Sequence, residues 1–358
     1  MILLFFGIMW AILLVFTLTA PFIYYPIIII AFLLSLIGFP LMQTIIKTEK
    51  ARNYVLYPLM AVAFIAAFVI TSWFIFKPAK SATPKIGPVD SSRKAVIFFC
   101  QGEMEEYTPS YSKKLLEKYP YILKPMKAFQ LKRLYKKAGG SSKNLSLIKV
   151  ASEVKNSLLN NGPYYYYIAF SDYYPSIETS LSQAIEDGCG DITIINYTSS
   201  YELNEKNSSS LSLDSLKSQG IDVRVSLPVC SSQAFQQVFL SRIINMPEKY
   251  DGILLIGKFN PFSTSLQSML IENGYSSKQI IVTESLREGL DYFSNNDCSD
   301  VLYVDLNQSG DGIVSQALIP QEISRYNPSF SVKGIRDWGY DIGFVRASIE
   351  VFTACQNK

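Results

Sequence analysis

Apolar and polar positions divide the chain into two parts of different character. The first 46 residues contain no charged side chain, and the break at Thr19-Ala-Pro21 separates apolar stretches at 2–19 and 22–46. A third apolar stretch covers 55–76. A hydrocarbon core about 30 Å thick is crossed by about 20 apolar residues in a helix. The pattern therefore predicts a membrane domain of three transmembrane helices within residues 1–77.

This pattern does not determine on which side of the membrane the following domain lies. A cleaved signal peptide would begin with basic residues, but no Lys or Arg precedes Lys47, so we expect the helices to be retained. Three basic residues lie between Lys47 and Arg52, and three between Lys77 and Lys85. The two ends of the third span therefore carry equal numbers of basic residues, and the positive-inside rule does not predict its orientation.

After the membrane part, short apolar runs alternate with amphipathic stretches. Residues 78–93 contain three prolines and several serines and predict a linker. The domain at 94–358 opens with Ala95-Val-Ile-Phe-Phe-Cys100 and then Gly102, as expected for a buried strand followed by a tight turn. Strands are expected at 95–100, 164–170, 191–197, 223–227, 252–256, 279–282 and 300–306. Helices are expected within 110–137 and at 147–159, 176–187, about 211–219, 233–245, 263–273, 285–293 and near 343–353.

This alternation occurs in two successive halves, about 94–228 and 229–358. Strands that alternate with helices form parallel sheets with right-handed connections. We therefore predict a two-lobed, doubly wound α/β domain whose ligand site lies at the carboxyl ends of the strands.

The composition excludes several kinds of chemistry. The chain has no histidine, which removes His-based triads and the commonest metal ligand. The net charge of +3 gives no case for nucleic-acid binding. The five cysteines show no CxxC spacing and indicate free thiols in a reducing compartment. Cys100 and Cys230 lie in or beside apolar strands, where a buried, inert thiol is the favoured interpretation.

Two segments carry a resemblance to a known family. The run 131–158, centred on Leu134-Tyr-Lys-Lys-Ala-Gly-Gly-Ser-Ser142, is similar to the ferrochelatase segment "YxxIGGxSPLxxIT". The segment Tyr167–Glu178, followed by Ala184–Gly188 and Ile192–Ile195, is similar to that family's "GxRYxxPxIExAxxxxxxDG" pattern. The resemblance covers about 100 residues in the first half and extends more loosely to Pro320. It implies a class II chelatase fold.

The same resemblance implies a metal site that this chain does not carry. One family His falls on Ser199 and a second falls near Phe259. The partner Glu falls at about Val314, where Asp311 is the nearby carboxylate. Metal insertion requires a ligand for the ion and bases for the pyrrole protons, which Ser, Phe and Val cannot supply.

Tyrosines at the predicted carboxyl edge are candidates for replacing these groups. The four are Tyr173, Tyr174, Tyr197 and Tyr201, and Tyr ligates haem iron in catalases. Because the chain has 23 tyrosines, many of them in predicted strands, packing is the favoured interpretation.

Two further patterns resemble sites less closely. Glu103, Glu105 and Glu106 follow the first strand, and we interpret them as dipole complements and solvated charge rather than as a paired-carboxylate site. The loop Ser309-Gly-Asp-Gly312 lacks the third Gly and the Lys of a phosphate-binding loop.

Three functions of different classes remain. The favoured hypothesis is a membrane-anchored, catalytically inactive ferrochelatase-like protein that serves as a structural or accessory subunit of a larger membrane complex. Ferrochelatases work at energy-transducing membranes, so the resemblance implies the mitochondrial inner membrane or a bacterial plasma membrane, with the respiratory chain or ATP synthase as the setting. The second hypothesis is a tetrapyrrole- or haem-binding protein, and the third is an active ferrochelatase with rearranged ligands. The expected partners are other membrane subunits and the lipid bilayer, and no bound cofactor is expected under the favoured hypothesis.

Overall fold

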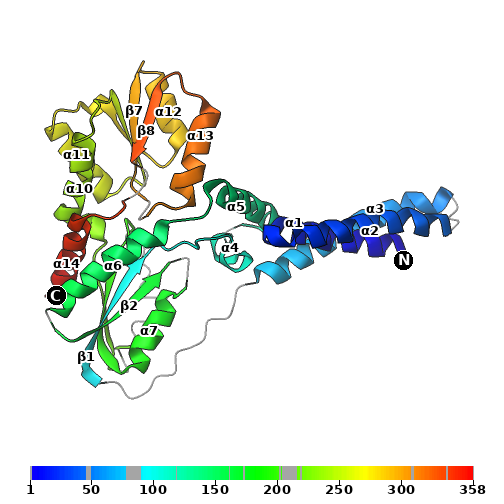
Figure 1. Ribbon diagram of the computed structural model, residues 1–358, viewed down its shortest axis with the longest axis horizontal. Helices are drawn as coiled ribbons and strands as arrows, with labels where there is room; N and C mark the ends of the chain where they lie inside the picture. Colours follow the sequence, from blue (N-terminus) through cyan, green and yellow to red (C-terminus); the bar gives the residue numbers. More distant parts are fainter. Residues whose placement is uncertain are drawn as a thin grey trace. The chain divides into compact units, whose positions relative to one another are not determined.

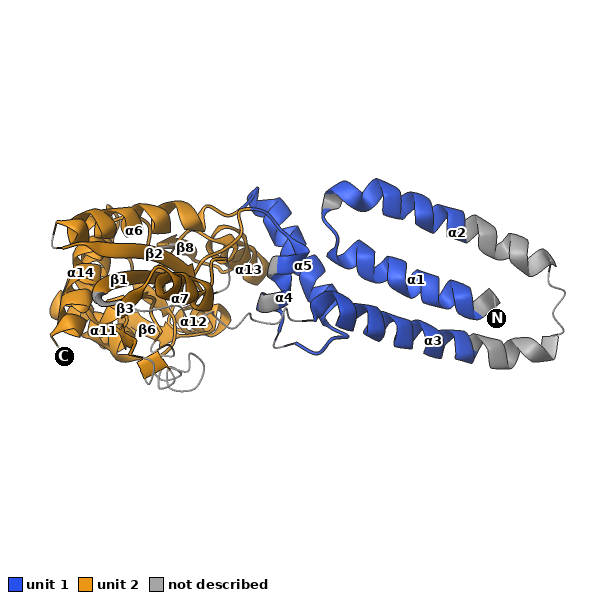
Figure 2. Ribbon diagram, turned by 90° about the horizontal axis from the view of Figure 1, so that it is seen from below, with its two compact units in different colours: residues 1–82, 106–140 blue, residues 83–105, 141–358 orange. Residues whose placement is uncertain are grey.

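The computed structural model describes the chain in segments that fall into two compact units. It describes residues 2–45, 50–77, 90–117, 119–160, 162–171, 174–200, 203, 216–217, 220–307, 310–335 and 338–357. Unit 1 comprises residues 1–82 and 106–140, and unit 2 comprises residues 83–105 and 141–358 (Figure 2). Most of the predicted linker, and the tyrosines Tyr173 and Tyr201, lie outside the described residues.

Unit 1 is built from apolar helices that pack side by side. Its elements are α1 (Ile2–Thr19), η1 (Phe22–Tyr24), α2 (Tyr25–Ile45), α3 (Lys50–Phe76), α4 (Pro109–Leu115) and α5 (Lys124–Ala138). The indole Nε1 of Trp10 donates to Ser35 Oγ at 3.0 Å, which ties α1 to the antiparallel α2. A Cβ on Gly7 would lie 2.8 Å from Met60 Cγ, so the glycine permits α1 to approach α3 closely.

Three helices occupy the three predicted apolar stretches, but the prediction of three membrane spans is not met within the described residues. Among the described residues, Pro58–Phe76 is the helix whose length and composition suit a bilayer. The other two contribute shorter apolar helices, Leu4–Thr19 and Tyr25–Ser35, below the roughly 20 residues that a span requires. Only 11% of the Pro58–Phe76 window is buried, which is not the burial of a core helix.

Unit 2 contains two parallel four-stranded sheets, as the alternating pattern predicts (Figure 1). In the first sheet the order is β2-β1-β3-β4, and in the second it is β6-β5-β7-β8. Between β1 and β3, and between β5 and β7, the chain reverses the direction in which it adds strands. The strands are β1 (Asp90–Cys100), β2 (Tyr164–Phe170), β3 (Cys189–Tyr197), β4 (Asp222–Val225), β5 (Gly252–Ile256), β6 (Ile280–Thr283), β7 (Asp300–Asp305) and β8 (Ser331–Ile335).

The helices of unit 2 flank these sheets and mostly match the predicted stretches. They are α6 (Lys143–Leu159), α7 (Ile177–Glu186), α10 (Gln233–Ile244), α11 (Pro261–Glu272), α12 (Leu286–Ser294), α13 (Ile319–Tyr326) and α14 (Ile342–Gln356). Unit 2 also has two 3-10 helices, η2 (Val229–Ser231) and η3 (Ser277–Gln279), and one π-helix, η4 (Val314–Leu318), within its described residues. Ser176 caps the start of α7, since its Oγ accepts from Thr179 N. The sequence pattern did not indicate β8 and α13, and the predicted helix at 211–219 lies largely outside the described residues.

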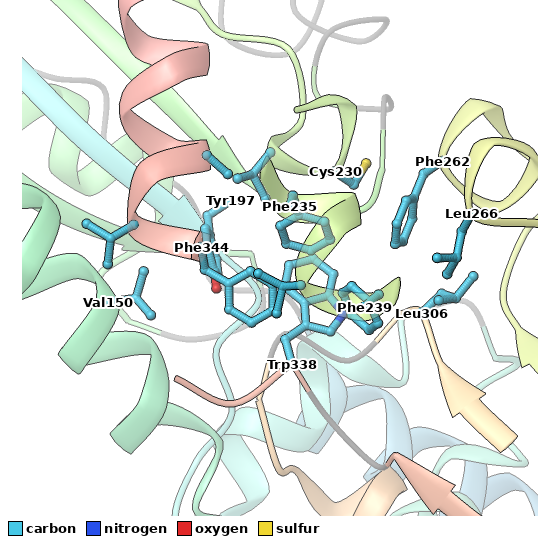
Figure 3. Close-up of a cluster of buried hydrophobic side chains, with 14 of the residues drawn as sticks. Val150, Tyr197, Cys230, Phe235, Phe239, Phe262, Leu266, Leu306, Trp338 and Phe344 are labelled. Carbon is cyan, nitrogen blue, oxygen red and sulfur yellow. The ribbon is translucent and has the colours of Figure 1, made fainter. Parts of the chain in front are cut away.

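An aromatic core joins the two sheets on one of their faces (Figure 3). Phe235 of α10 lies 4.7 Å from Trp338 and 4.8 Å from Phe344 of α14, ring centre to ring centre. Trp338 also packs at 5.5 Å on Tyr197 of β3. Because α14 contributes to the same core as α6 and β3, a helix from the second half of the sequence covers the first sheet.

Candidate functional site

Short polar residues gather at the carboxyl ends of the central strands, beside the two points where strand order reverses. Open parallel sheets bind ligands at such points. Glu103 follows β1, Ser199 follows β3, Asn260 begins α11 after β5, and Asn307 follows β7. Asn260 Nδ2 donates to the Ser199 carbonyl at 3.4 Å, which links the edges of the two sheets.

Glu103 is the most heavily bonded carboxylate at this edge. Its side chain is 8% exposed, and Oε2 accepts from Ser141 Oγ at 2.6 Å and from Ile313 N at 2.9 Å. Its backbone N donates to Asn144 Oδ1 at 3.1 Å, and Asn144 Nδ2 donates to its carbonyl at 2.6 Å. We call Glu103, Ser141, Asn144 and Ile313 the inter-sheet clamp. It joins the end of β1, the start of α6 and the segment after β7.

Two glycines allow the segment after β7 to reach the clamp. A Cβ on Gly312 would lie 2.4 Å from Glu103 Oε2, and one on Gly310 would lie 2.5 Å from the carbonyl oxygen of Lys143. Both distances are too short for a side chain, so close packing explains these glycines. Ser309, the first residue of this motif, lies outside the described residues.

Beside the clamp lies a group of buried oxygen atoms with unused hydrogen-bonding capacity. Gln316 Nε2 donates to Ser142 Oγ at 2.7 Å and to the Asp311 carbonyl at 2.9 Å. Asp311 Oδ1, Ser315 Oγ and Gln316 Oε1 are buried and have no hydrogen-bond partner within the described part of the chain. Ser315 and Gln316 belong to the π-helix η4, a geometry that is frequent at functional sites. This group suits ordered water or another small hydrogen-bond donor.

The positions to which the ferrochelatase resemblance assigns metal-site groups have three different surroundings. Ser199 is buried and its carbonyl accepts from Asn260. Phe259 is 75% exposed. Val314 packs against the apolar cluster that includes Leu286 and Ile319.

The candidate tyrosines are not brought together where they are described. Tyr197 is fully buried and packs at 4.9 Å on Phe98, whereas Tyr174 is 73% exposed. Tyr173 and Tyr201 lie outside the described residues. Among the described candidates, Asp311 lies beside the clamp. Its backbone carbonyl accepts from Ser142 Oγ at 3.2 Å.

The interpretation of Glu103 as solvated helix-start charge is wrong. No helix begins there, since α4 starts at Pro109, and the Glu103 side chain is buried. Glu105 and Glu106 are exposed, as the interpretation as solvated charge predicts. The clamp could not be predicted from the sequence because its acceptor, Glu103, lies 38 and 210 residues from the two donors. The one local signal was the small polar pair Ser141-Ser142 after two glycines. Ser142 does not cap α6 with its side chain.

Cys100 and Cys230 of this unit are buried among apolar side chains. Burial raises the pKa of the Cys100 thiol far above its ordinary value and that of Cys230 to about 12. Both are therefore protonated near neutral pH, and the thiolate is the form that ligates metal. Within the described ranges no three His, Cys, Asp or Glu side chains are grouped so as to hold a metal ion.

Two pockets of unit 2 lie away from the clamp. One of about 770 Å³ lies at the end of β6 and is lined by α12 and α13, with Arg287, Arg325, Glu284 and Glu322 at its wall. The other, of about 380 Å³, lies at the end of β4 against α14, where Ser232 Oγ donates to Glu350 Oε2 at 2.5 Å. The first pocket carries equal numbers of Arg and Glu side chains, so it shows no preference for ligand charge.

The sheets and their edge define a two-lobed parallel α/β protein. Solved structures to which the chain is similar include chelatases. The chain is similar to SirB from Bacillus subtilis with Fe3+, with a TM-score of 0.48 and 12% identity over 74% of this chain and 95% of that one. It is similar to the sirohydrochlorin chelatase SirB from Bacillus subtilis subspecies spizizenii in complex with cobalt, with a TM-score of 0.46 and 11% identity over 74% and 96%. A third neighbour is DR2241 from Deinococcus radiodurans, a multi-domain protein described as structurally similar to chelatases, with a TM-score of 0.44 and 12% identity over 73% and 54%.

Sequence comparisons add no relative. No family model matches the chain, and no curated protein matches it. The TM-scores and identities of the structural neighbours are too low to transfer a residue role, so no site is assigned from them.

Proposed function

We propose that this protein is a membrane-attached, chelatase-like α/β protein that works by contact with other subunits of a membrane complex and not by metal insertion. The respiratory chain or ATP synthase of an energy-transducing membrane is the setting that the ferrochelatase resemblance suggests. In this proposal unit 1 holds the chain at the bilayer and unit 2 supplies the contact surface.

One observation carries the proposal, namely the side chains at the edge where the reaction would occur. Ser199, Phe259 and Val314 stand at the positions that the resemblance assigns to the metal-site groups. The buried carboxylate, Glu103, already accepts two hydrogen bonds through one oxygen. A chelatase needs a metal ligand and bases that take two protons from the macrocycle. Ser, Phe and Val supply neither, and Asp311 Oδ1 is a carboxylate oxygen at this edge without a partner among the described residues.

Membrane attachment is supported by the surface of unit 1. Ile27, Phe74 and Phe5 are 67%, 66% and 63% exposed, and further large apolar side chains are exposed along α1, α2 and α3. Contiguous apolar surface of this kind is unfavourable in water and marks a membrane or protein contact. The helix Pro58–Phe76 is long enough for the first of these.

Two experiments test the proposal in its two parts. The full chain, purified in mild detergent from its native membrane, is expected to be retained after alkaline carbonate washing and to carry a reproducible set of membrane subunits. A chain that carbonate releases contradicts attachment, and a chain that purifies alone contradicts the subunit role.

Activity is tested on the same detergent-purified full chain. With iron or cobalt and a porphyrin or sirohydrochlorin, we expect no insertion above the spontaneous rate, with an active chelatase as positive control. Insertion well above that rate overturns the proposal and favours an enzyme with rearranged ligands, whose first candidate is Asp311. A Soret band in the purified protein favours a tetrapyrrole binder instead.

A further inference from the structure

Lysine side chains at one end of unit 1 are held over aromatic rings. Lys77 Nζ lies 5.0 Å from the Trp73 ring centre, whereas Lys124, whose Nζ lies 4.1 Å from the Tyr121 ring centre, is buried. Lys127 Nζ lies 5.4 Å from the Tyr119 ring centre. Aromatic rings with Lys side chains that extend toward water are enriched where a membrane protein meets the headgroup layer.

These pairs lie where two apolar helices end. Phe76, the last residue of α3, packs with Leu116 and Ala128 in a cluster that also includes Tyr119 and Tyr121. At the end of α1, Lys132 Nζ donates to the carbonyls of Thr17 and Ala20, each at 2.9 Å. Helix α5 therefore crosses the ends of both α1 and α3 (Figure 2), at the level where hydrocarbon would give way to headgroups.

The segment that forms this end is strongly basic. Residues 106–140 contain nine Lys or Arg and two Glu, a net charge of +7, whereas the whole chain carries +3. The rest of the chain is therefore net acidic, and the basic charge is concentrated at the end of the apolar helices. A polybasic segment beside a membrane helix is attracted to anionic lipid.

Apolar side chains accompany the charges. Ile122, Leu123 and Met126 are 50%, 38% and 53% exposed at the start of α5, directly after Tyr121 of the Phe76 cluster. Trp73 and Phe74 near the end of α3 are also exposed. An element with both exposed apolar residues and lysines suits the boundary between acyl chains and headgroups.

We infer that residues 106–140, together with the end of α3, form a binding surface for the anionic phospholipids of one membrane leaflet. The inference rests on the membrane attachment proposed above and goes further by naming the lipid class and the residues. Lys77 and Lys127 bind headgroup phosphates, while Trp73, Ile122 and Met126 insert at the acyl boundary. The positive-inside rule then places this end on the cytoplasmic or matrix side, a choice that the linear sequence leaves open.

The test uses the full chain in nanodiscs of phosphatidylcholine, with or without phosphatidylglycerol. Energy transfer from tryptophan is measured to dansyl-labelled phosphatidylglycerol and, separately, to dansyl-labelled phosphatidylcholine. The ratio of the two reports which lipid is enriched around the protein. The wild type is expected to enrich phosphatidylglycerol, and added salt is expected to abolish the preference because screening weakens it. In K77Q/K127Q the preference constant is expected to fall about thirtyfold, which is the combined strength of two lysines at an anionic surface.

A matched control separates this surface from general charge effects. K155Q/K249Q removes the same charge from exposed positions of unit 2 and is expected to keep the wild-type preference. Failure of the chain to enter phosphatidylcholine nanodiscs contradicts membrane attachment itself. Stable incorporation with equal transfer to both lipids, at every salt concentration, overturns the lipid inference alone. An equal loss of the lipid preference in K77Q/K127Q and in K155Q/K249Q also overturns the lipid inference. It is overturned as well if the surface around Lys77 and Lys127 binds an acidic protein in place of lipid.

Discussion

Unit 1 and unit 2 place apolar and polar side chains in opposite ways. In unit 2 the largest apolar groups, such as Trp338 and Phe235, are fully buried. In unit 1 large apolar side chains such as Ile27 are exposed, while Lys132 is 1% exposed. Each arrangement is favourable in a different solvent, because apolar surface is costly in water and an unsatisfied polar group is costly in lipid. Under the membrane attachment proposed above, each unit is suited to a different medium.

The two units nevertheless surround a buried charged side chain in the same way. Lys132 Nζ donates to two carbonyls and, at 2.6 Å, to Tyr25 Oη. Glu103 Oε2 accepts from a hydroxyl and a backbone N–H. In both units the charge binds neutral groups of distant segments, so each residue acts as a connector whose removal leaves its partners unsatisfied.

The largest effect is expected from the aromatic core of unit 2. Phe235→Ala removes a ring that packs on Trp338 and Phe344, and we expect a loss of about 3 to 5 kcal/mol of unfolding free energy. Trp338 is the one tryptophan of unit 2, so its fluorescence, in a background with the other two replaced by Phe, reports the transition. Phe259→Ala, at a side chain 75% exposed, should cost less than about 0.5 kcal/mol. Equal losses would contradict the described core.

The inter-sheet clamp should give the next largest effect. Glu103→Ala leaves Ser141 Oγ and Ile313 N without their acceptor, at an expected cost of about 3 kcal/mol. The same Trp338 signal measures it in urea. Glu105→Ala, two residues away and exposed, is the control and should change little. A Glu103→Ala chain as stable as wild type would mean that the carboxylate is solvated.

In unit 1, Lys132→Met tests the buried ammonium. The variant keeps the apolar stem but removes the donor to the Ala20 carbonyl, while the Thr17 carbonyl still accepts from Tyr25 Oη at 2.8 Å. We expect a loss of about 2 kcal/mol, measured as thermal unfolding of helices in detergent. Arg133→Met, at the exposed neighbour, is the control.

Lys132 also gives a signed pH dependence. Burial lowers its pKa from 10.5 to about 8, so the ammonium predominates at neutral pH. Between pH 8 and 10.5 the folded chain has released a proton that the unfolded chain keeps, and this group therefore adds stability as pH rises. The slope of stability against pH in this window should flatten in Lys132→Met. If the slope of stability against pH is the same in Lys132→Met as in the wild type, another group causes the pH dependence.

The smallest effect concerns thiol labelling. Burial raises the pKa of Cys230 to about 12, so a maleimide near neutral pH should not modify it in the folded chain, whereas the partly exposed Cys298 should react first. Because the unfolded chain loses this thiol proton at lower pH than the folded chain, Cys230 favours unfolding as pH rises from about 8.5 to 12. Peptide mass mapping after brief labelling checks the order.

The sequence pattern predicted the repeating elements better than the site. Strands such as Tyr164–Phe170 and Gly252–Ile256 matched the structure, because their apolar runs are bounded by turn residues. β8 was missed because Ser331-Val-Lys-Gly-Ile335 is partly exposed and mixes polar and apolar residues. Its Gly334 accommodates the Tyr303 ring, a contact that periodicity cannot indicate.

The site depended on contacts between distant segments. Glu103 looked solvated because its two acidic neighbours are exposed, and nothing near it in sequence shows that Ile313 closes over it. Likewise, Lys132 lies in a run of basic residues, and only the fold distinguishes it from the exposed Arg133.

The position of α14 has a consequence for biosynthesis. Its Phe352 ring packs at 5.7 Å against Tyr164 of β2, nearly two hundred residues earlier in the chain. During translation the part of the first sheet that α14 covers therefore stays exposed until Ile342–Gln356 has been made. We expect the two lobes to acquire their native packing together, and the nascent chain to need a chaperone during that interval.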